Sequence, residues 1–434
     1  MSWVAGVVAA ASVVLGATAG SVLAATAEVE FQAQIAISNA IERGGEFQKN
    51  ELSFEPRIDI WFAGGARLTA KGLLRSDFAD KLEPGRPSND TRSSYSGRIA
   101  LGEHTEFEVR ELFLDFELGE TQMRVGKQQV VWGQADGLRI LDVVNPLSFR
   151  EFILPDFEDR RIPLWMVNAE VPVGEAALQL LWIPDQTYDE FADASGAFAF
   201  TSPKFRPVLD QVVRIRSARK PNNFLEDSDV GARLSAFVSG WDLTASYLYH
   251  YQDQPVLVLD RSSGMTQVTP TYERTHLAGV TASKAFGDFV FRGELGYSTD
   301  RYFASSESVQ GIEKSFEASG VLGLDYSGFT DLLISGQFFQ SSVEGGSGMQ
   351  RAQHERSVSL LLRRNFSNDT VTLEMLAIHN TNDSDGLVQI ELSYQLTSNI
   401  TISAGADVFY GDADGVFGQF DARDRFSLKV EIGV

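Results

Sequence analysis

The chain has 434 residues, no cysteine, and 59 acidic against 37 basic side chains, which gives a formal net charge of -22 at pH 7. The lack of cysteine excludes disulfides, thiolate metal sites and cysteine nucleophiles. The acidic balance argues against a nucleic-acid partner, because phosphates would be repelled. Thirty Phe and 38 Gly suit a protein of many strands, aromatic faces and tight turns.

The first 27 residues form an apolar run of Val, Ala, Leu and Gly that ends in Ala25-Thr26-Ala27, an A-x-A cleavage site. This pattern predicts a signal peptide over 1–27 and a single domain over 28–434. No Lys or Arg precedes the apolar run, so an N-terminal membrane anchor is the alternative. Beyond it, no stretch approaches the ~18 uncharged apolar residues that a spanning helix needs.

Many segments alternate strictly between apolar and polar residues, as FSLKVEIGV does. Phe426 and Leu428 would lie on one face of a strand, with Lys429 and Glu431 on the other. This pattern predicts an all-β fold of about eighteen strands (roughly 16 to 18). The expected strands cover 28–42, 50–63, 65–76, 106–118, 121–132, 164–173, 176–183, 229–239, 241–251, 274–285, 289–299, 313–326, 331–343, 355–366, 370–379, 387–397, 400–410 and 424–434.

Short and long connections alternate between these strands. The expected tight turns are Gly64, Gly119-Glu120, Gly174-Glu175, Gly240, Gly287-Asp288, Ser327-Gly328, Ser367-Asn368-Asp369 and Thr397-Ser398-Asn399. The long connections, 77–105, 133–163, 184–228 and 252–273, are rich in Pro, Asp, Ser and Gly. This asymmetry is typical of a transmembrane antiparallel β-barrel with short periplasmic turns and long outer loops.

A soluble β-sandwich shows the same alternation and is the competing fold. The signal-like start, the alternating loop lengths and the aromatic residues near strand ends favour the barrel. In a barrel the last strand would pair with the first, EVEFQAQIAI, so that no edge is left open. We therefore predict a closed barrel located in the outer membrane of a Gram-negative bacterium.

A barrel of this size is too wide for side chains to fill, so its inward face borders water. The polar face of the predicted strands carries both signs of charge, which can also simply solvate the lumen and pair across it. The expected inward residues are Arg67, Thr69, Lys71, Glu111, Asp115, Glu117, Arg233, Asp242, Arg292, Glu294, Glu317, Glu374, Lys429 and Glu431.

The 133–163 connection is unusual because about half of it is apolar, and such a loop would not stay in water. We expect it to fold into the barrel and to plug or constrict it, where its charges could set selectivity. A plug without a role in selection is the alternative. The lumen and constriction candidates are Lys127, Trp132, Asp136, Arg139, Asp142, Asn145, Arg150, Glu151, Asp156, Arg160 and Arg161.

The run from Gly126 to Gly137, GKQQVVWGQADG, followed by Asp142 and Asn145-Pro146, also resembles a known motif. It is similar to the most recognisable segment of a proteobacterial outer-membrane β-barrel family catalogued as a domain of unknown function. The resemblance implies a porin-like outer-membrane barrel. Members of that family tend to be discussed with lipid or hydrophobic-compound export systems, and the resemblance implies no catalytic residues.

Enzymatic signatures are missing from the sequence, which contains no G-x-S-x-G, H-E-x-x-H, P-loop or G-x-G-x-x-G run. We therefore expect no enzyme activity, no cofactor and no metal. An outer-membrane lipase or protease could still assemble a Ser-His-acid site from separate strands. A His within hydrogen-bond reach of a Ser or carboxylate on the outer wall would indicate that alternative.

Two acidic stretches imitate the start of a calcium loop, Asp383-Ser384-Asp385-Gly386 and Asp412-Ala413-Asp414-Gly415. Neither has an acidic residue at the twelfth place, so turn chemistry explains both. The one basic run, from Arg214 to Lys220, falls in a long outer loop, where it is either a solvated surface or a contact for lipopolysaccharide phosphates.

Together these patterns predict an outer-membrane porin-like channel for passive passage of small solutes. The runner-up is the outer-membrane component of a lipid or hydrophobic-compound transport or export system, with the apolar half of the 133–163 loop lining the route. A sealed structural barrel is third. The expected partners are outer-membrane lipids and lipopolysaccharide, the barrel-assembly machinery, periplasmic transport proteins and further copies of the chain.

Overall fold

The structure is a computed structural model that describes residues 27–205, 214–261, 266–345 and 348–434. Apart from Ala27, which begins the first strand, the expected signal peptide lies outside the described residues. Part of the basic run from Arg214 to Lys220 forms the short strand β11 (Arg214–Ile215).

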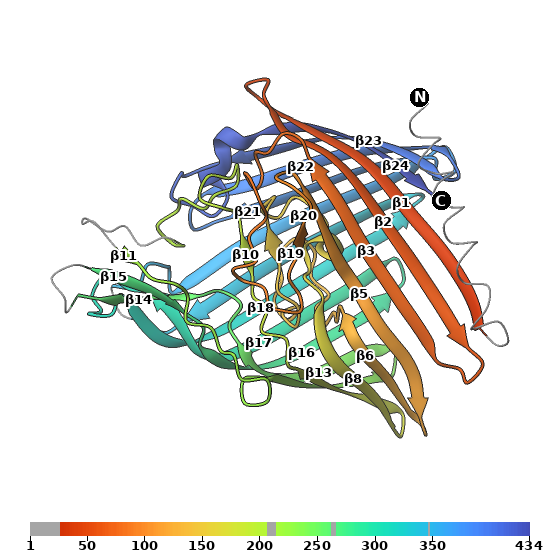
Figure 1. Cartoon of the computed structure of the whole chain (residues 1–434), viewed down its shortest axis with the longest axis horizontal. Helices are drawn as coiled ribbons and strands as arrows, with labels where there is room; N and C mark the ends of the chain where they lie inside the picture. The colour runs from red at the N-terminus through yellow and green to blue at the C-terminus, as the bar shows by residue number, and fades with distance from the viewer. Residues whose placement is uncertain (1–26, 206–213, 262–265, 346–347) are drawn as a thin grey trace.

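Within the described residues, eighteen antiparallel strands form one closed barrel (Figure 1). Each strand pairs with the next, and β24 returns to β1 from Gln34↔Gly433 to Glu42↔Arg425, which confirms the predicted closure. The barrel strands are β1 (Ala27–Glu42), β2 (Phe47–Phe62), β3 (Arg67–Asp77), β5 (Thr105–Leu118), β6 (Thr121–Gln128), β8 (Leu164–Val173), β9 (Ala176–Ile183), β12 (Asp229–Val238), β13 (Trp241–Tyr251), β16 (Arg274–Phe286), β17 (Phe289–Ala304), β18 (Ile312–Phe329), β19 (Leu332–Val343), β20 (His354–Phe366), β21 (Val371–Asn380), β22 (Asp385–Thr397), β23 (Ile400–Tyr410) and β24 (Arg425–Gly433).

Every predicted strand has a counterpart, but some boundaries were wrong. The strand expected over 121–132 ends at Gln128, because the chain leaves the wall there and the Val130 N–H donates to the Asn145 side chain instead of a neighbouring strand. The turn expected at Ser327-Gly328 lies inside β18. A register shift between Tyr326 and Phe329 lengthens that strand, and the reversal follows at 330–331.

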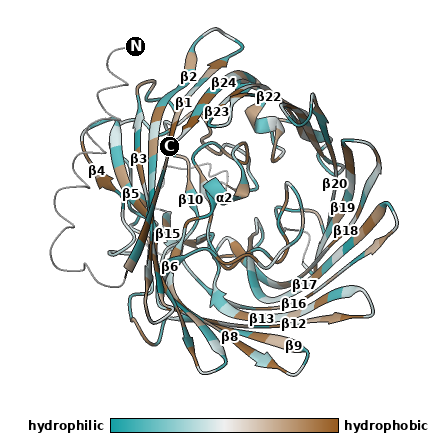
Figure 2. Ribbon diagram, turned by 90° about the vertical axis from the view of Figure 1, so that its right-hand side faces the viewer, coloured by the Kyte–Doolittle hydropathy of each residue, from teal (hydrophilic) through white to brown (hydrophobic). Residues whose placement is uncertain are grey.

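The two faces of the strands differ as the alternation predicted. Outward side chains such as Leu392 and Phe426 are 47% and 69% exposed, an arrangement suited to contact with acyl chains. On the other face of β24, Lys429 and Glu431 point inward and form an ion pair of 2.7 Å. Figure 2 shows the ring of strands with apolar and polar residues mixed along each ribbon, as this alternation requires.

The connections also fall into two groups. The short turns at 119–120, 174–175, 239–240 and 287–288 lie at the same end of the barrel as the start of β1 and the end of β24. At the other end, the long connections carry small elements. β14 (Val256–Asp260) and β15 (Gln267–Thr271) form a small sheet with β11 that projects from this end (Figure 1).

The remaining elements are the short strands β4 (Ile99–Ala100), β7 (Ser148–Phe149) and β10 (Glu190–Phe191), the helical turn α2 (Phe157–Arg160) and a 3-10 helix, η1 (Gly418–Arg423). Among the described residues, no helix has the length and apolar character needed to cross a membrane.

Candidate functional site

Residues 129–163, between β6 and β8, run inside the barrel, and we call them the inward segment. Figure 2 looks into the ring of strands and shows α2 and β10 within it. The segment contains β7, which pairs in parallel with β10, and α2. All the predicted lumen residues except Lys127 belong to it.

One side of the inward segment packs directly against the wall. The side chains of Trp132 and Leu141 lie over glycines of β12, β16 and β17, where no wall side chain stands in the way. A Cβ at Gly279 would lie 2.4 Å from Leu141 Cδ2, and one at Gly231 would lie 2.8 Å from Trp132 Cη2. Any larger residue there would have to displace the segment, so these glycines permit the close approach.

Polar contacts fix the same side. Arg292 of β17 forms an ion pair of 2.6 Å with Asp136, and Gln337 of β19 both donates to the Asp136 carboxylate at 2.8 Å and accepts from its backbone N–H at 3.0 Å. The Glu294 carboxylate accepts the backbone N–H of Leu141 at 3.3 Å. The segment is therefore anchored to β17 and β19 by directional bonds as well as packing.

The two ends of the inward segment are tied together by Asn145, whose side chain is 1% exposed. Its Oδ1 accepts the Val130 N–H at 2.8 Å, and its Nδ2 donates to the Ile162 carbonyl at 2.9 Å. Just before the inward segment begins, the buried Lys127 of β6 lies 3.7 Å from Glu108 of β5. The side chain of Lys127 therefore links β6 to β5 within the barrel wall, next to the point where the inward segment begins.

Two further arginines, Arg139 and Arg161, stabilise the conformation of the inward segment. Arg161 forms a 2.6 Å ion pair with Asp142, and Arg139 donates to the Asn145 carbonyl at 3.0 Å and faces Asp189 at 3.4 Å. These guanidinium groups are engaged by nearby acceptors. We therefore assign Arg139, Asp142 and Arg161 to the internal structure of the segment.

The opposite side of the segment meets β2, β3 and β24 through charges. Arg150 forms ion pairs of 2.9 Å with Glu51 of β2 and with Asp77 of β3. All three side chains are buried. Because a buried charge needs a close partner, this cluster fixes the distance between the segment and the wall.

Glu151 makes the neighbouring contact, with ion pairs of 2.6 Å to Lys49 and 2.8 Å to Arg425. Burial alone would raise the pKa of Glu151, but attraction to Lys49, Arg425 and Arg150 outweighs it and holds that pKa well below its ordinary value. The carboxylate therefore stays ionised at neutral pH, and this charged contact persists.

The last two predicted residues flank α2. Asp156 is exposed and precedes the helical turn without a side-chain capping bond. Arg160 ends the turn, and its guanidinium carbon lies 4.4 Å from the centre of the Phe157 ring. Unlike Arg139, Arg150 and Arg161, the Arg160 side chain has no ion pair within the described part of the chain.

Open space lies between this charged side and the wall. A cavity of about 270 Å³, which we call the inner-wall cavity, is bounded by α2, Arg150 and the inward residues of β1, β2, β3 and β24. A second cavity of about 500 Å³ continues toward the short turns and shares Gln34, Glu55, Lys71 and Glu431 with the first. Toward the long loops, a cleft of about 20 Å³ shares Arg75 and Arg150 with it.

Sequence reasoning missed Lys49, Glu51 and Arg75, which line this space, and Arg425, which pairs with Glu151 beside it. Arg75 belongs to the two-residue series that contains Arg67, so the alternation of β3 could have identified it. Lys49 and Arg425 lie near strand ends, where alternation is weakest. Their pairing with one residue of the inward segment is a tertiary feature that no local pattern encodes.

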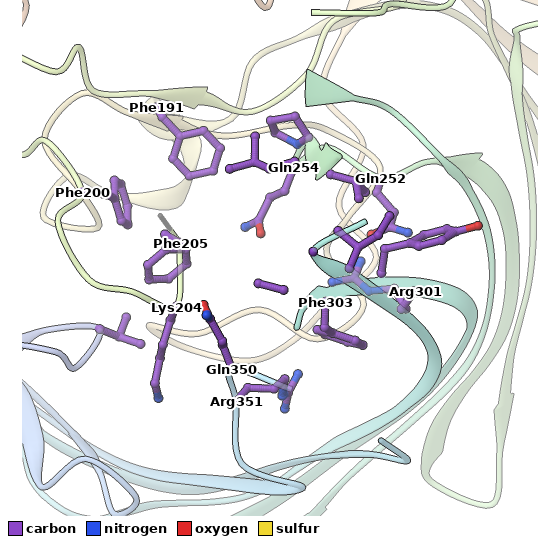
Figure 3. A pocket seen from close by; sticks show the side chains of 18 of the residues that line it. Phe191, Phe200, Lys204, Phe205, Gln252, Gln254, Arg301, Phe303, Gln350 and Arg351 are labelled. Carbon is purple, nitrogen blue, oxygen red and sulfur yellow. The ribbon is translucent and has the colours of Figure 1, made fainter. Parts of the chain in front are cut away.

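A separate pocket of about 320 Å³ lies at the long-loop end, and we call it the aromatic pocket. Figure 3 shows Phe191, Phe200 and Phe205 on one side, facing Arg301 and Phe303 across the opening. The Phe200 ring packs edge-on against both neighbouring rings, with centroid distances of 5.3 and 4.9 Å. The pocket thus combines an apolar wall with polar side chains.

Two of the described histidines lie close to a group that a Ser-His-acid site requires. His354 Nδ1 lies 3.0 Å from Ser342 Oγ, but these residues are direct cross-strand partners on β20 and β19. Among the described residues, the one histidine that faces a carboxylate is His104, 3.4 Å from Asp80. The His354 pair therefore lacks the acid that would orient it.

The acidic stretch at Asp383-Ser384-Asp385-Gly386 has a structural role. The Asp385 carboxylate accepts the backbone N–H groups of Phe417 at 2.6 Å and Gly418 at 3.1 Å, and Asp383 pairs with Lys204. The described residues contain no group of three or more His, Asp or Glu placed to hold a metal ion.

The fold is a closed antiparallel β-barrel of the kind seen in solved structures of outer-membrane proteins. The barrel is similar to OccAB2 of Acinetobacter baumannii, with a TM-score of 0.54, 12% identity, and coverage of 94% of this chain and 98% of that chain. It is also similar to OccK2 (OpdF) of Pseudomonas aeruginosa in complex with glucuronate (TM-score 0.52, 13% identity, 94% and 98% coverage) and to the outer membrane protein OpdK of the same species (0.51, 12%, 94% and 99%).

The family is shown by residues 75–353, which match the family described as "Protein of unknown function (DUF1302)". The chain belongs to this family, and the matched range contains the GKQQVVWGQADG motif that resembles it. No curated protein matches the chain.

Proposed function

We propose that this protein is a channel through which small solutes pass passively, along the space between the inward segment and the wall formed by β1, β2, β3 and β24. In this proposal the inward segment constricts the lumen, and Arg150 stands at the narrowest point. No covalent chemistry is involved. Channel function also agrees with the porin-like fold.

The observation that carries the proposal is a series of three cavities with shared lining residues. The cleft at the long-loop end, the inner-wall cavity and the cavity near the short turns share lining residues in series. The volumes of the three cavities are about 20, 270 and 500 Å³, and Arg150 lines the two smaller ones, which supports its assignment to the constriction. Rings of opposed charge of this kind set selectivity in other channels.

Single-channel recording in planar bilayers tests this proposal. The wild-type barrel is expected to carry a steady current. A variant in which 138–158 is replaced by a short Gly/Ser linker is expected to conduct several-fold better, because most of the inward segment is then absent from the lumen. A heat-modifiable shift on gel electrophoresis, compared with wild type, checks that the variant barrel folds. Silence of both proteins would contradict the proposal and favour a sealed structural barrel.

The aromatic pocket favours a second candidate, the outer-membrane component of a lipid or hydrophobic-compound transport system. The apolar half of the inward segment does not line the cavities, since Leu141 and Phe152 are buried in two separate apolar clusters. The rings of Phe191, Phe200 and Phe205 would therefore receive an apolar solute instead. Uptake of N-phenylnaphthylamine that exceeds uptake of a polar solute of the same size would favour this candidate.

The proposal includes a location in a Gram-negative outer membrane, with lipids and lipopolysaccharide around the apolar outer face. The chain would reach the outer membrane through its cleaved signal peptide and the barrel-assembly machinery. Contacts with periplasmic transport proteins or with further copies of the chain belong to the same proposal.

A further inference from the structure

Arg160 is the one charged side chain of the inner-wall cavity that is both deeply buried and without an ion pair in the described part of the chain. Its side chain is 4% exposed, it lines the cavity of about 270 Å³, and its Nε atom has no hydrogen-bond partner among the described residues. Buried charges in proteins are normally paired, so this arrangement needs a reason.

The other cations that line the same cavity are satisfied. Their ion pairs are Lys49–Glu151 at 2.6 Å, Lys71–Glu55 at 2.9 Å, Lys429–Glu431 at 2.7 Å, Arg150–Glu51 at 2.9 Å, and Arg75 with Glu106. Arg110 donates to the backbone carbonyls of Glu158, Asp159 and Arg161. A general lack of carboxylates in the lumen therefore does not explain the state of Arg160.

The surroundings of Arg160 favour an anion. Burial and the like charge of Arg139, with a smaller effect of Arg161, lower the pKa of Arg160 to about 9 against the opposing attraction of Asp156 and Asp142, so the guanidinium remains protonated at neutral pH. The carboxylates of Glu158 and Asp159 also border the cavity, but they are exposed and make no ion pair with Arg160 in the described structure. An anion beside Arg160 would relieve both its desolvation and the repulsion from neighbouring cations.

We propose that Arg160 is an anion subsite of the lumen that binds the carboxylate of a small organic acid. The proposal deepens the channel function and rests on it for its physiological role. A guanidinium presents a planar fork of N–H donors that matches the two oxygens of a carboxylate. The Phe157 ring beneath the guanidinium holds the fork in place and offers an apolar surface to the rest of the solute.

A structural role for Arg160 would predict a different effect on stability. Removing an unpaired buried charge does not cost stability and can increase it. We therefore expect Arg160→Met to retain the thermal unfolding temperature of wild type or to exceed it, while it loses anion binding. A lowered unfolding temperature in Arg160→Met would contradict the proposal.

Binding of benzoate to purified, detergent-solubilised barrel tests the proposal directly by isothermal titration calorimetry, with benzamide as the uncharged analogue. Wild type is expected to bind benzoate at least tenfold more tightly than Arg160→Met, and to bind benzamide no better than the variant does. Lys71→Met is the matched control, because Lys71 lines the same cavity but is paired with Glu55; it should keep benzoate affinity within about threefold of wild type.

Arg160→Lys keeps the charge and removes the fork, so an affinity between those of wild type and Arg160→Met is expected. This variant tests the geometry of the anion contact separately from its charge. Equal benzoate affinity in wild type and Arg160→Lys, or equal binding of benzamide and benzoate, would overturn the proposal.

Calorimetry needs no ion flow, so the two proposals fail separately. A barrel that is silent in bilayers yet loses benzoate binding in Arg160→Met would contradict the channel function alone. A barrel with steady current and unchanged benzoate binding in Arg160→Met would contradict the anion subsite alone.

Discussion

The inward segment meets the barrel wall in two different ways. Toward β12, β16 and β17, wall glycines let Trp132 and Leu141 approach closely, and the contact is apolar and buried. Toward β2, β3 and β24, Arg150 and Glu151 reach the wall through ion pairs, with cavities beside them. One side is an apolar packed contact, and the other is a set of ion pairs beside cavities.

In the proposed channel, this difference lets one loop fill part of the barrel and leave a route beside it. Apolar contact closes space efficiently because it removes the gap between surfaces. Long charged side chains instead hold two surfaces apart and leave a polar cavity between them. In the proposed channel, the side of the route is therefore set by which wall residues are glycine and which are ionised.

The largest expected effect, on both stability and conductance, comes from breaking the ion pairs of Arg150. Arg150→Ala leaves Glu51 and Asp77 buried without their shared cation, and we expect a loss of ~3 to 5 kcal/mol in the free energy of unfolding. The same variant should conduct better and prefer cations more strongly, because two carboxylates then border the narrow point. Urea titration in lipid vesicles and reversal potentials in a salt gradient measure the two effects.

Arg150→Lys is the control for this variant, since it keeps one positive charge between the two carboxylates. Its stability and selectivity should lie between those of wild type and Arg150→Ala. Wild-type selectivity in Arg150→Ala would show that the narrow point is elsewhere.

A smaller effect is expected on the packed side. Leu141→Ala removes a side chain that is 1% exposed, and we expect a loss of ~3 kcal/mol from lost burial and the cavity left behind. Single-channel conductance should stay at the wild-type value, because this side carries no route. A conductance increase as large as that of Arg150→Ala would contradict the contrast between the two sides.

The sequence predicted the wall of the barrel well because each strand carries its own period-two signal. Residues 164–173, 176–183, 241–251 and 400–410 match the observed strands at both ends. The error at 129–132 arose where Val and Trp continue a strand-like composition after the chain has left the wall. Composition alone does not report that departure, since it depends on the distant Asn145.

The site was less accessible to sequence reasoning. An apolar, charged loop of this length indicated a buried location, but no local signal indicates which wall it packs against. That choice depends on glycines such as Gly231 and Gly279, more than 60 residues away in the chain. The unpaired state of Arg160 is equally invisible in sequence, because it depends on which distant carboxylates fail to reach it.

The absence of native cysteine makes the most direct test of the account possible, because a single introduced thiol can report on each side of the inward segment. Ser53 of β2 lines the inner-wall cavity, whereas Thr281 of β16 is buried on the packed side. A cationic methanethiosulfonate reagent is expected to reduce single-channel current in Ser53→Cys and to leave the current of Thr281→Cys unchanged. An equal response at both positions, or a response at Thr281→Cys alone, would contradict a route on the charged side.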